Sequence, residues 1–94
     1  MLYAPYAVQY SSDQNKINAY EYKGYLDMHF GRYQDALAAY DQLLKMVPKH
    51  ANAYYMRGFA LLNLGQRAAA CASFNNALSL GDTRAQEALD TYCK

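Results

Sequence analysis

A 34-residue frame occurs twice in this chain and constrains the fold more than any other sequence feature. The segment AYEYKGYLDMHFGR at residues 19–32 aligns with AYYMRGFALLNLGQ at residues 53–66, with Ala, Tyr and both Gly positions in register. The register continues along the chain, where Ala36 aligns with Ala70 and Tyr40 with Phe74. A repeat of this length is typical of proteins built from stacked units, each of which buries its apolar face against its neighbours.

Each unit has the pattern of two helices separated by a glycine. Apolar residues recur at spacings of three and four on both sides of Gly31. Pro48 should end the second helix of the first unit, because proline lacks an amide donor and clashes with the preceding turn. Gly81 should follow the second helix of the next unit. The sequence thus predicts helices at about 13–30, 33–47, 51–64, 67–80 and 83–93.

Small residues are predicted to face each other within each pair of helices, Gly24 with Ala36 and Gly58 with Ala70. Small residues on facing sides let two helix axes approach closely, and large neighbours then fill the flanking space. The large neighbours are Tyr20 and Tyr40 in the first unit, and Tyr54 and Phe74 in the second.

These residues resemble the tetratricopeptide repeat family. The family pattern of aromatic, Gly, Ala, aromatic and Pro is matched by Tyr20, Gly24, Ala36, Tyr40 and Pro48, and then by Tyr54, Gly58, Ala70, Phe74 and Ala77, with Asp82 in the usual proline place. The resemblance covers residues 17–82. It implies an all-α fold, a right-handed solenoid of helical hairpins whose first helices line a concave groove.

The expected organisation is one domain over residues 1–94. It comprises an N-terminal segment at 1–16, repeat 1 at 17–50, repeat 2 at 51–82 and a capping helix at 83–94, because two repeats alone are few for a stable stack. Tyr3, Tyr6 and Tyr10 have helical spacing. They form either a short packing helix that starts at Pro5 or the remnant of a preceding repeat.

The side of each first helix that faces away from its packing partner is the candidate binding surface. Its residues are Asn18, Glu21, Tyr22, Tyr25, Met28 and His29 in the first unit and Asn52, Tyr55, Met56, Phe59, Leu62 and Asn63 in the second. An apolar centre with a polar rim is typical of a protein-binding surface. We therefore predict a protein–protein interaction module that binds a partner peptide or helix in an aromatic-lined groove.

Helical geometry makes this prediction specific, since residues five apart lie on roughly opposite sides of a helix. Exposure should accordingly be greater for Tyr22, Tyr25, Tyr55 and Phe59 than for Tyr20 and Tyr54. Two alternatives remain open at this stage. The N-terminal tyrosines fold back over the surface, or the same aromatic surface serves homo-oligomerisation in a structural or assembly protein.

The resemblance also indicates which ligand not to expect. The best-known subgroup of the family holds an acidic C-terminal peptide with a clamp of Lys, Asn and Arg. The corresponding places here contain Glu21, Tyr25, Met56 and Phe59. An acidic carboxylate-clamp peptide is therefore not the expected partner, and hydrophobic and aromatic contacts should dominate.

Charged residues occupy positions where the family has apolar ones. Lys23 and Asp27 lie one turn apart on the helix-packing side, and Arg57 is the repeat equivalent of Lys23. The functional interpretation is a ligand-contacting triad. The structural interpretation, which we favour, is a polar bridge between adjacent helices whose long stems pack as apolar surface.

Composition and motifs argue against chemistry, cofactors and nucleic acid. Nine basic and eight acidic residues give a formal charge of +1, which provides no field to attract a duplex. His29 and His50 lie on different elements without a neighbouring ligand at metal spacing. No apolar run reaches the roughly 18 residues of a membrane span. We expect no catalysis, no cofactor, no metal and no membrane span.

Cys71 and Cys93 are candidates for a disulfide bond. If the last two helices form an antiparallel hairpin, both cysteines lie at the same height, because each is 11 residues from Asp82. Height and direction allow a bridge, and the alternative is two small hydrophobic residues. A bridge would indicate an exported or periplasmic protein, whereas the cytoplasm is the default compartment.

Overall fold

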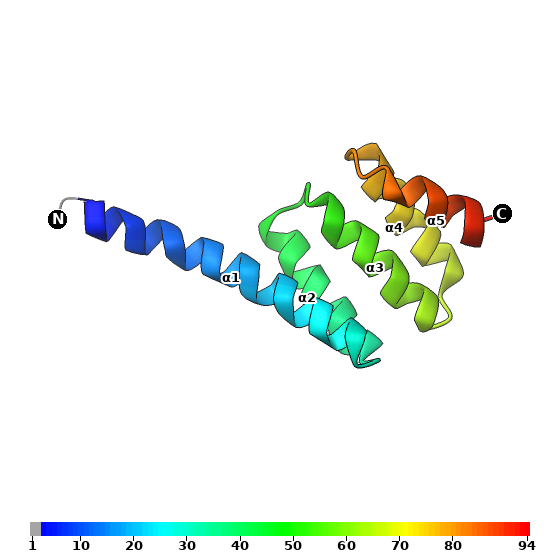
Figure 1. The fold of residues 1–94 in the computed structure, drawn as a ribbon, viewed down its shortest axis with the longest axis horizontal. Coiled ribbons are helices and arrows are strands. Elements are labelled where there is room, and N and C mark those ends of the chain that lie inside the picture. Colours follow the sequence, from blue (N-terminus) through cyan, green and yellow to red (C-terminus); the bar gives the residue numbers. More distant parts are fainter. Residues whose placement is uncertain (1–2) are drawn as a thin grey trace.

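The computed structural model describes the backbone of residues 3–94 and the side chains of residues 13–94. Five helices follow one another, namely α1 (Tyr3–His29), α2 (Tyr33–Met46), α3 (Ala51–Asn63), α4 (Arg67–Ser79) and α5 (Arg84–Tyr92). Each helix packs against its neighbour in the chain, and α1 and α5 lie at opposite ends of the row (Figure 1). The predicted all-α, helical-hairpin solenoid is confirmed.

Helix boundaries agree with the prediction within one residue at every end except the first. The first helix begins at Tyr3 and not near residue 13. Pro5 does not prevent this, because proline is tolerated in the first turn of a helix. Tyr3, Tyr6 and Tyr10 therefore belong to α1 and form no separate packing helix; their side chains, and the alternative that they cover the groove, lie outside the described residues.

Glycines end the helices where the sequence indicated. Gly31 and Gly81 have φ values of 77° and 101°, in the left-handed region that glycine adopts without a steric penalty. After Gly81, the amide of Asp82 donates to the carbonyl of Ala77 at 3.0 Å, which satisfies a carbonyl at the end of α4. The chain can therefore reverse in a few residues and bring consecutive helices side by side.

An aromatic ring lies directly on a glycine in each hairpin. A Cβ atom added to Gly24 would be 2.6 Å from Cζ of Tyr40, and one added to Gly58 would be 2.5 Å from Cε1 of Phe74. Tyr40 and Phe74 are 1% and 0% exposed. The prediction of close helix approach at these glycines is confirmed, but the atoms nearest to each glycine belong to the aromatic ring of the next helix and not to the predicted partners Ala36 and Ala70.

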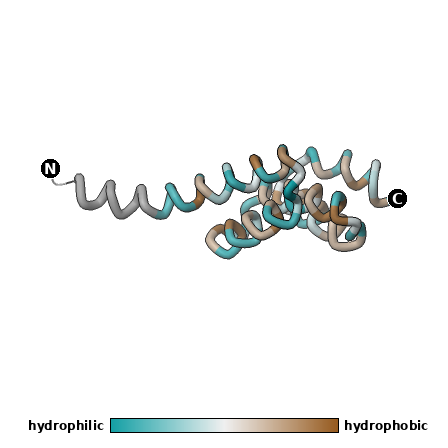
Figure 2. The backbone as a smooth tube through the Cα atoms, turned by 90° about the horizontal axis from the view of Figure 1, so that it is seen from below, coloured by the Kyte–Doolittle hydropathy of each residue, from teal (hydrophilic) through white to brown (hydrophobic). Residues whose placement is uncertain are grey.

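The rings belong to two small cores, both of which extend beyond a single hairpin. The first joins Tyr40 and Leu43 of α2 to Ala53 and Ala60 of α3. The second is formed by Leu61, Ala70, Phe74, Ala77, Ala85 and Ala88. Hydrophobic and hydrophilic residues alternate along the described helices (Figure 2), as expected for helices that bury one face only.

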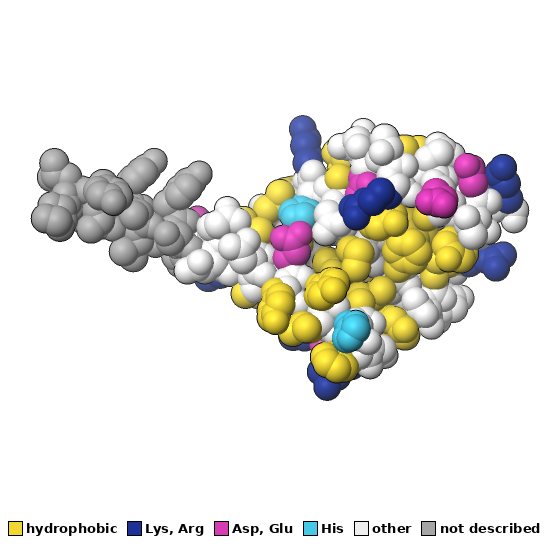
Figure 3. All heavy atoms as spheres, in the orientation of Figure 1, with side chains coloured by type: hydrophobic (Ala, Val, Ile, Leu, Met, Phe, Trp, Pro, Cys, Tyr) yellow, Lys and Arg dark blue, Asp and Glu magenta, His cyan; other side chains and the backbone are white. Residues whose placement is uncertain are grey.

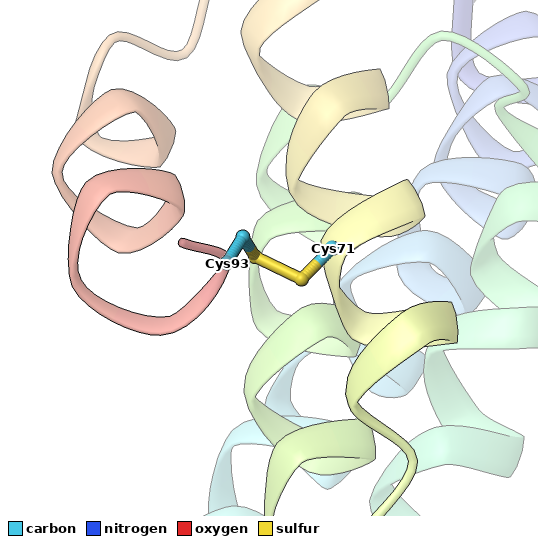
Figure 4. The surroundings of a disulfide bond; sticks show 2 residues. All are labelled: Cys71 and Cys93. Atoms are coloured by element: carbon cyan, nitrogen blue, oxygen red, sulfur yellow. A yellow bond between two sulfur atoms is a disulfide. The ribbon is translucent and has the colours of Figure 1, made fainter.

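A disulfide bond between Cys71 and Cys93 joins α4 to the end of α5 (Figure 4). The two Cα atoms are 5.9 Å apart, inside the range that a bridge requires. Of the two alternatives for these cysteines, the disulfide bond is therefore the one that the structure contains. Because α5 is short and lies at the end of the stack, the bond holds down the helix with the fewest neighbours.

We predict that Gly58→Ala lowers the free energy of unfolding by up to about 2 kcal/mol, because overpacking costs about 1–3 kcal/mol and the gain in helix propensity returns about 1 kcal/mol. Urea denaturation measures this change. Asn75→Ala, at an exposed position of α4, is the matched control and should not destabilise. In a double-mutant cycle, Phe74→Leu should reduce the cost of Gly58→Ala. Equal costs in the presence and absence of Phe74 would contradict the contact.

We predict that reducing the Cys71–Cys93 bond lowers the free energy of unfolding by roughly 3 kcal/mol, since the bond closes a loop with a sequence separation of 22. Urea denaturation with and without a reductant measures the change. The variant Cys71→Ala/Cys93→Ala should match the reduced protein and should not respond to the reductant. A response of the double variant would show that the reductant acts elsewhere.

Candidate functional site

A hollow of about 660 Å³ opens between α1 and α3, with α5 at its edge. Its lining residues are Asn18, Glu21, Tyr22, Tyr25, Tyr40, Asn52, Met56 and Arg84. Figure 3 shows hydrophobic side chains gathered on this face of the molecule, with charged groups around them. Ligand sites in proteins commonly have volumes of roughly 300–1,000 Å³, so the hollow is large enough to take several side chains.

The apolar part of the hollow is supplied mainly by aromatic residues of the first hairpin. Tyr22 and Tyr25 on α1 are 65% and 57% exposed, whereas Tyr20 is half-buried. Tyr40 lines the hollow from α2, and Met56 of α3 packs on the first core. The predicted contrast in exposure is thus confirmed for the first repeat. It leaves two neighbouring tyrosine rings accessible to a ligand.

Burial of Tyr40 raises the pKa of its hydroxyl to about 12, and the negative charges of Glu21 and Asp27 contribute in the same direction. The phenol therefore stays protonated at neutral pH. It supplies a neutral polar group beside the hollow and no phenolate for acid–base chemistry.

A series of polar contacts connects the first helices of successive hairpins at this hollow. Asn52 of α3 donates from Nδ2 to Glu21 of α1 at 3.2 Å. Its Oδ1 accepts from Nη2 of Arg84 on α5 at 2.8 Å. Asn52 therefore fixes the spacing between α1 and α5 across α3. We refer to the contacts among Glu21, Asn52 and Arg84 as the polar bridge.

His50 supports the same side of the hollow. Its Nδ1 accepts from the amide of Ala53 at 3.1 Å and caps the start of α3. In the neutral ring the proton then resides on Nε2, which lies 3.7 Å from Oε2 of Glu21. The cap thus presents a polar edge to the carboxylate that begins the polar bridge.

Arg84 is held firmly in place. Its Nε and Nη2 donate to the carboxylate of Asp82 at 2.8 and 2.5 Å, and its guanidinium lies 4.2 Å from the ring centroid of Tyr55. The hydrogen bonds from Arg84 keep the pKa of Asp82 below its ordinary value and raise the pKa of Arg84. The hollow is thus bordered by a planar cation that contacts a ring and pairs with a carboxylate.

The second repeat contributes a smaller hollow of about 180 Å³, which includes Tyr55, Phe59, Arg84 and Tyr92. The ring of Phe59 is 5.0 Å from that of Phe74 and 6.1 Å from that of Tyr92, measured between centroids. Tyr54, Tyr55 and Phe59 are all half-buried, so the predicted contrast in exposure does not appear in this repeat. The reason is α5, whose residues Arg84 and Tyr92 partly cover the aromatic surface.

The structure separates the twelve predicted binding residues into three groups. Asn18, Glu21, Tyr22, Tyr25, Asn52 and Met56 line the larger hollow, and Tyr55 and Phe59 line the smaller one. Met28, His29, Leu62 and Asn63 line neither. Met28 and Leu62 pack against the cores, and the side chain of Asn63 donates to the carbonyl of Phe59 at 2.8 Å near the end of α3.

Lys23 and Asp27 pair as predicted, but both lie on α1, so they form no bridge between adjacent helices, and Arg57 is not part of the pair. Lys23 Nζ lies 2.7 Å from Asp27 Oδ2, and Arg32 Nη1 lies 3.7 Å from Oδ1. The Lys23–Asp27 pair and Arg32 satisfy a carboxyl group that is almost fully buried. The pair shifts the pKa of Lys23 upward, mainly through its hydrogen bond to Asp27.

Arg57 instead connects three helices at another position. Its Nε donates to Asp41 of α2 at 2.7 Å, and its Nη1 donates to the fully buried hydroxyl of Ser73 of α4 at 2.7 Å. Arg57 is on α3, which packs between these two helices, whereas Asp27 is on α1. The positional equivalence of Lys23 and Arg57 therefore does not bring them together.

Sequence reasoning missed Arg84 as a site residue. Extending the 34-residue frame once more would have found it, because Lys16, His50 and Arg84 occupy equivalent positions. Each is a basic residue near the start of a groove-lining stretch. Tyr40 was assigned to the core alone, although it also contributes to the hollow.

Comparisons with known families agree with this geometry. A family model described as TPR repeat matches residues 24–65, and one described as Tetratricopeptide repeat matches residues 51–80. The chain belongs to the tetratricopeptide repeat family. Such repeats generally mediate protein–protein interactions, and the family is typically non-catalytic. Neither the curated proteins nor the solved structures that were compared include a significant match to the chain.

Two further properties bear on what this tetratricopeptide repeat domain binds. Among residues with described side chains, no cluster of three or more His, Cys, Asp or Glu could hold a metal ion. None of the helices, as far as they are described, combines the length and apolar character needed to cross a bilayer.

We predict that Asp82→Asn removes part of the acid sensitivity of the fold. The pKa of Asp82 is lower in the folded chain than its ordinary value of 3.8, so its ionised form stabilises the fold above that pH, and this contribution is lost as the pH falls below 3.8. Urea denaturation at pH 7 should therefore show a lower free energy of unfolding for Asp82→Asn than for wild type, and this difference should be smaller at pH 3. Asp90→Asn, at an exposed position of α5, is the control. A difference that is unchanged at pH 3 would contradict the role of Asp82.

Proposed function

We propose that the larger hollow binds a peptide segment of a protein partner, extended or helical, which inserts an apolar or aromatic side chain between α1 and α3. The observation that carries this proposal is the exposure of Tyr22 and Tyr25 on the wall of a hollow of about 660 Å³. Tyrosine and methionine are enriched at the centres of protein interfaces, where their apolar bodies can be desolvated.

The charges of the hollow support a ligand without strong net charge. The hollow contains one carboxylate, Glu21, and one guanidinium, Arg84. Glu21 accepts from Asn52, and Arg84 donates to Asp82 and Asn52, so both charged groups already have partners. A strongly acidic or basic ligand would have to break these contacts. The lack of the Lys, Asn and Arg clamp at Glu21, Tyr25, Met56 and Phe59 agrees with an apolar anchor.

The hollow is preformed, which favours binding of a flexible segment. The polar bridge holds α1, α3 and α5 at fixed spacing, and the glycine contacts hold each hairpin together. Because the domain has little to reorganise, the entropy lost on binding falls mainly on the ligand.

Selection from a random peptide library displayed on phage provides the probe. We expect wild-type protein to enrich peptides with aromatic or aliphatic anchors, and Tyr25→Ala/Met56→Ala to weaken a selected peptide at least tenfold in a calorimetric titration. Phe30→Ala, an exposed aromatic that does not line this hollow, is the matched control and should bind normally. Equal binding by the double variant would place the peptide elsewhere and overturn the proposal.

The alternative is that the hollow is an interface between copies of the chain. Sedimentation velocity over a range of concentrations separates the two. A monomer at all concentrations favours the peptide-binding site. A dimer that Tyr25→Ala abolishes favours assembly through the same tyrosines.

The disulfide bond supports the proposal of an oxidising compartment, because such bonds rarely persist in the cytosol. Blocking free thiols during extraction from the native source tests this part. Labelling of Cys71 and Cys93 at extraction would argue for the cytoplasm.

A further inference from the structure

A second surface lies on the outer side of α1 and shares only Tyr22 with the lining of the proposed peptide site. Ala19, Lys23, Leu26 and Phe30 follow one another at spacings of four, three and four and form one stripe. We call these four residues the outer stripe. They line a hollow of about 400 Å³ together with Tyr22, Asp27 and Arg32. Phe30 is 63% exposed, so a large apolar side chain here has little cover.

The second repeat shows which helix covers the equivalent positions on α3. The equivalents of Ala19 and Leu26, 34 residues later, are Ala53 and Ala60 on α3. Both are 0% exposed, and they pack in one cluster with Tyr40 and Leu43 of α2. In this fold the outer side of a first helix is therefore covered by the second helix of the hairpin before it. Helix α1 stands at the end of the row and lacks this cover among the described helices (Figure 1).

The charged residues at the outer stripe indicate what kind of helix would fit it. Arg57, the equivalent of Lys23, donates to Asp41 on the covering helix α2 at 2.7 Å. At the outer stripe, Lys23 and Arg32 flank the single carboxylate of Asp27. Two cations and one anion line this hollow, Asp35 also lies close enough to act on Lys23, and the Lys23 side chain is 57% exposed. A helix with an acidic residue would find its counter-ion here, as Asp41 does on α3.

We propose that the outer stripe binds an amphipathic α-helix of a partner protein, with an apolar face for Leu26 and Phe30 and an acidic residue for Lys23 and Arg32. The partner helix takes the place that α2 takes on α3. The domain then has two interaction surfaces, and the proposal does not depend on the peptide site between α1 and α3.

The chain itself provides a probe with this chemistry. A synthetic peptide of residues 33–46 reproduces α2, including Asp41. Isolated helices of this length are marginal in water, so a hydrocarbon staple joins positions 34 and 38, which are exposed in α2. Fluorescence anisotropy with the labelled peptide and the full chain measures binding.

We expect saturable binding that Phe30→Asp weakens at least tenfold. Leu26→Lys is the second variant and should have the same effect, and circular dichroism verifies that both variants fold. Tyr25→Ala changes the peptide site alone and should leave binding intact. Loss of binding in Tyr25→Ala with normal binding in Phe30→Asp would place the probe in the other hollow and overturn the proposal.

Charge is tested with a matched peptide in which Asp41 is replaced by Lys. We expect at least tenfold weaker binding of this peptide, and equal binding would contradict the requirement for an acidic residue. Absence of binding at millimolar peptide would also overturn the proposal. Sedimentation velocity tests whether a second copy of the chain occupies the outer stripe. A dimer that Phe30→Asp abolishes would overturn the proposal of a partner helix and indicate self-association instead.

Discussion

The contact between a glycine and the aromatic ring of the following helix determines how this domain is built. Gly24 lies under Tyr40 and Gly58 under Phe74, each too close for a Cβ atom. This contact sets the distance between the two helices of a hairpin, and it directs the remaining faces of those helices outward. When one face of a helix packs on its partner, the directions of its other faces are set as well. The contact therefore orients the groove side of α1 and α3 and the outer stripe of α1.

The two hairpins use this frame differently because their neighbours differ. In the second hairpin α5 closes the stack, and Tyr92 and the Arg84 guanidinium lie against the rings of Phe59 and Tyr55. In the first hairpin Tyr22 and Tyr25 stay exposed. The disulfide bond attaches the end of α5 to α4, and the polar bridge attaches the start of α5 to α3. Closure at this end thus leaves the accessible aromatic surface mainly on α1 and at its junction with α3.

Much of the fold was predictable because it depends on local patterns. Glycines at the turns, proline after α2 and the recurrence of small and aromatic residues gave the helices and their pairing. Counting residues on both sides of one turn showed that a Cys71–Cys93 bond was feasible. The partner of Arg57 was not predictable in this way. Its contacts with Asp41 and Ser73 join three helices, and a single helix pattern holds no information about which neighbour supplies a counter-ion.

The sequence by itself determined the repeat, the hairpins and the face of each first helix that turns away from its partner, because periodicity fixes direction around a helix axis. Only the tertiary structure decided how much of each face stays open. Phe59 is half-covered by α5 while Tyr25 is exposed, although both stand on groove-facing sides of first helices. Exposure depends on which helix arrives from the next layer, and Arg84 enters the hollow from a layer that lies beyond both repeats.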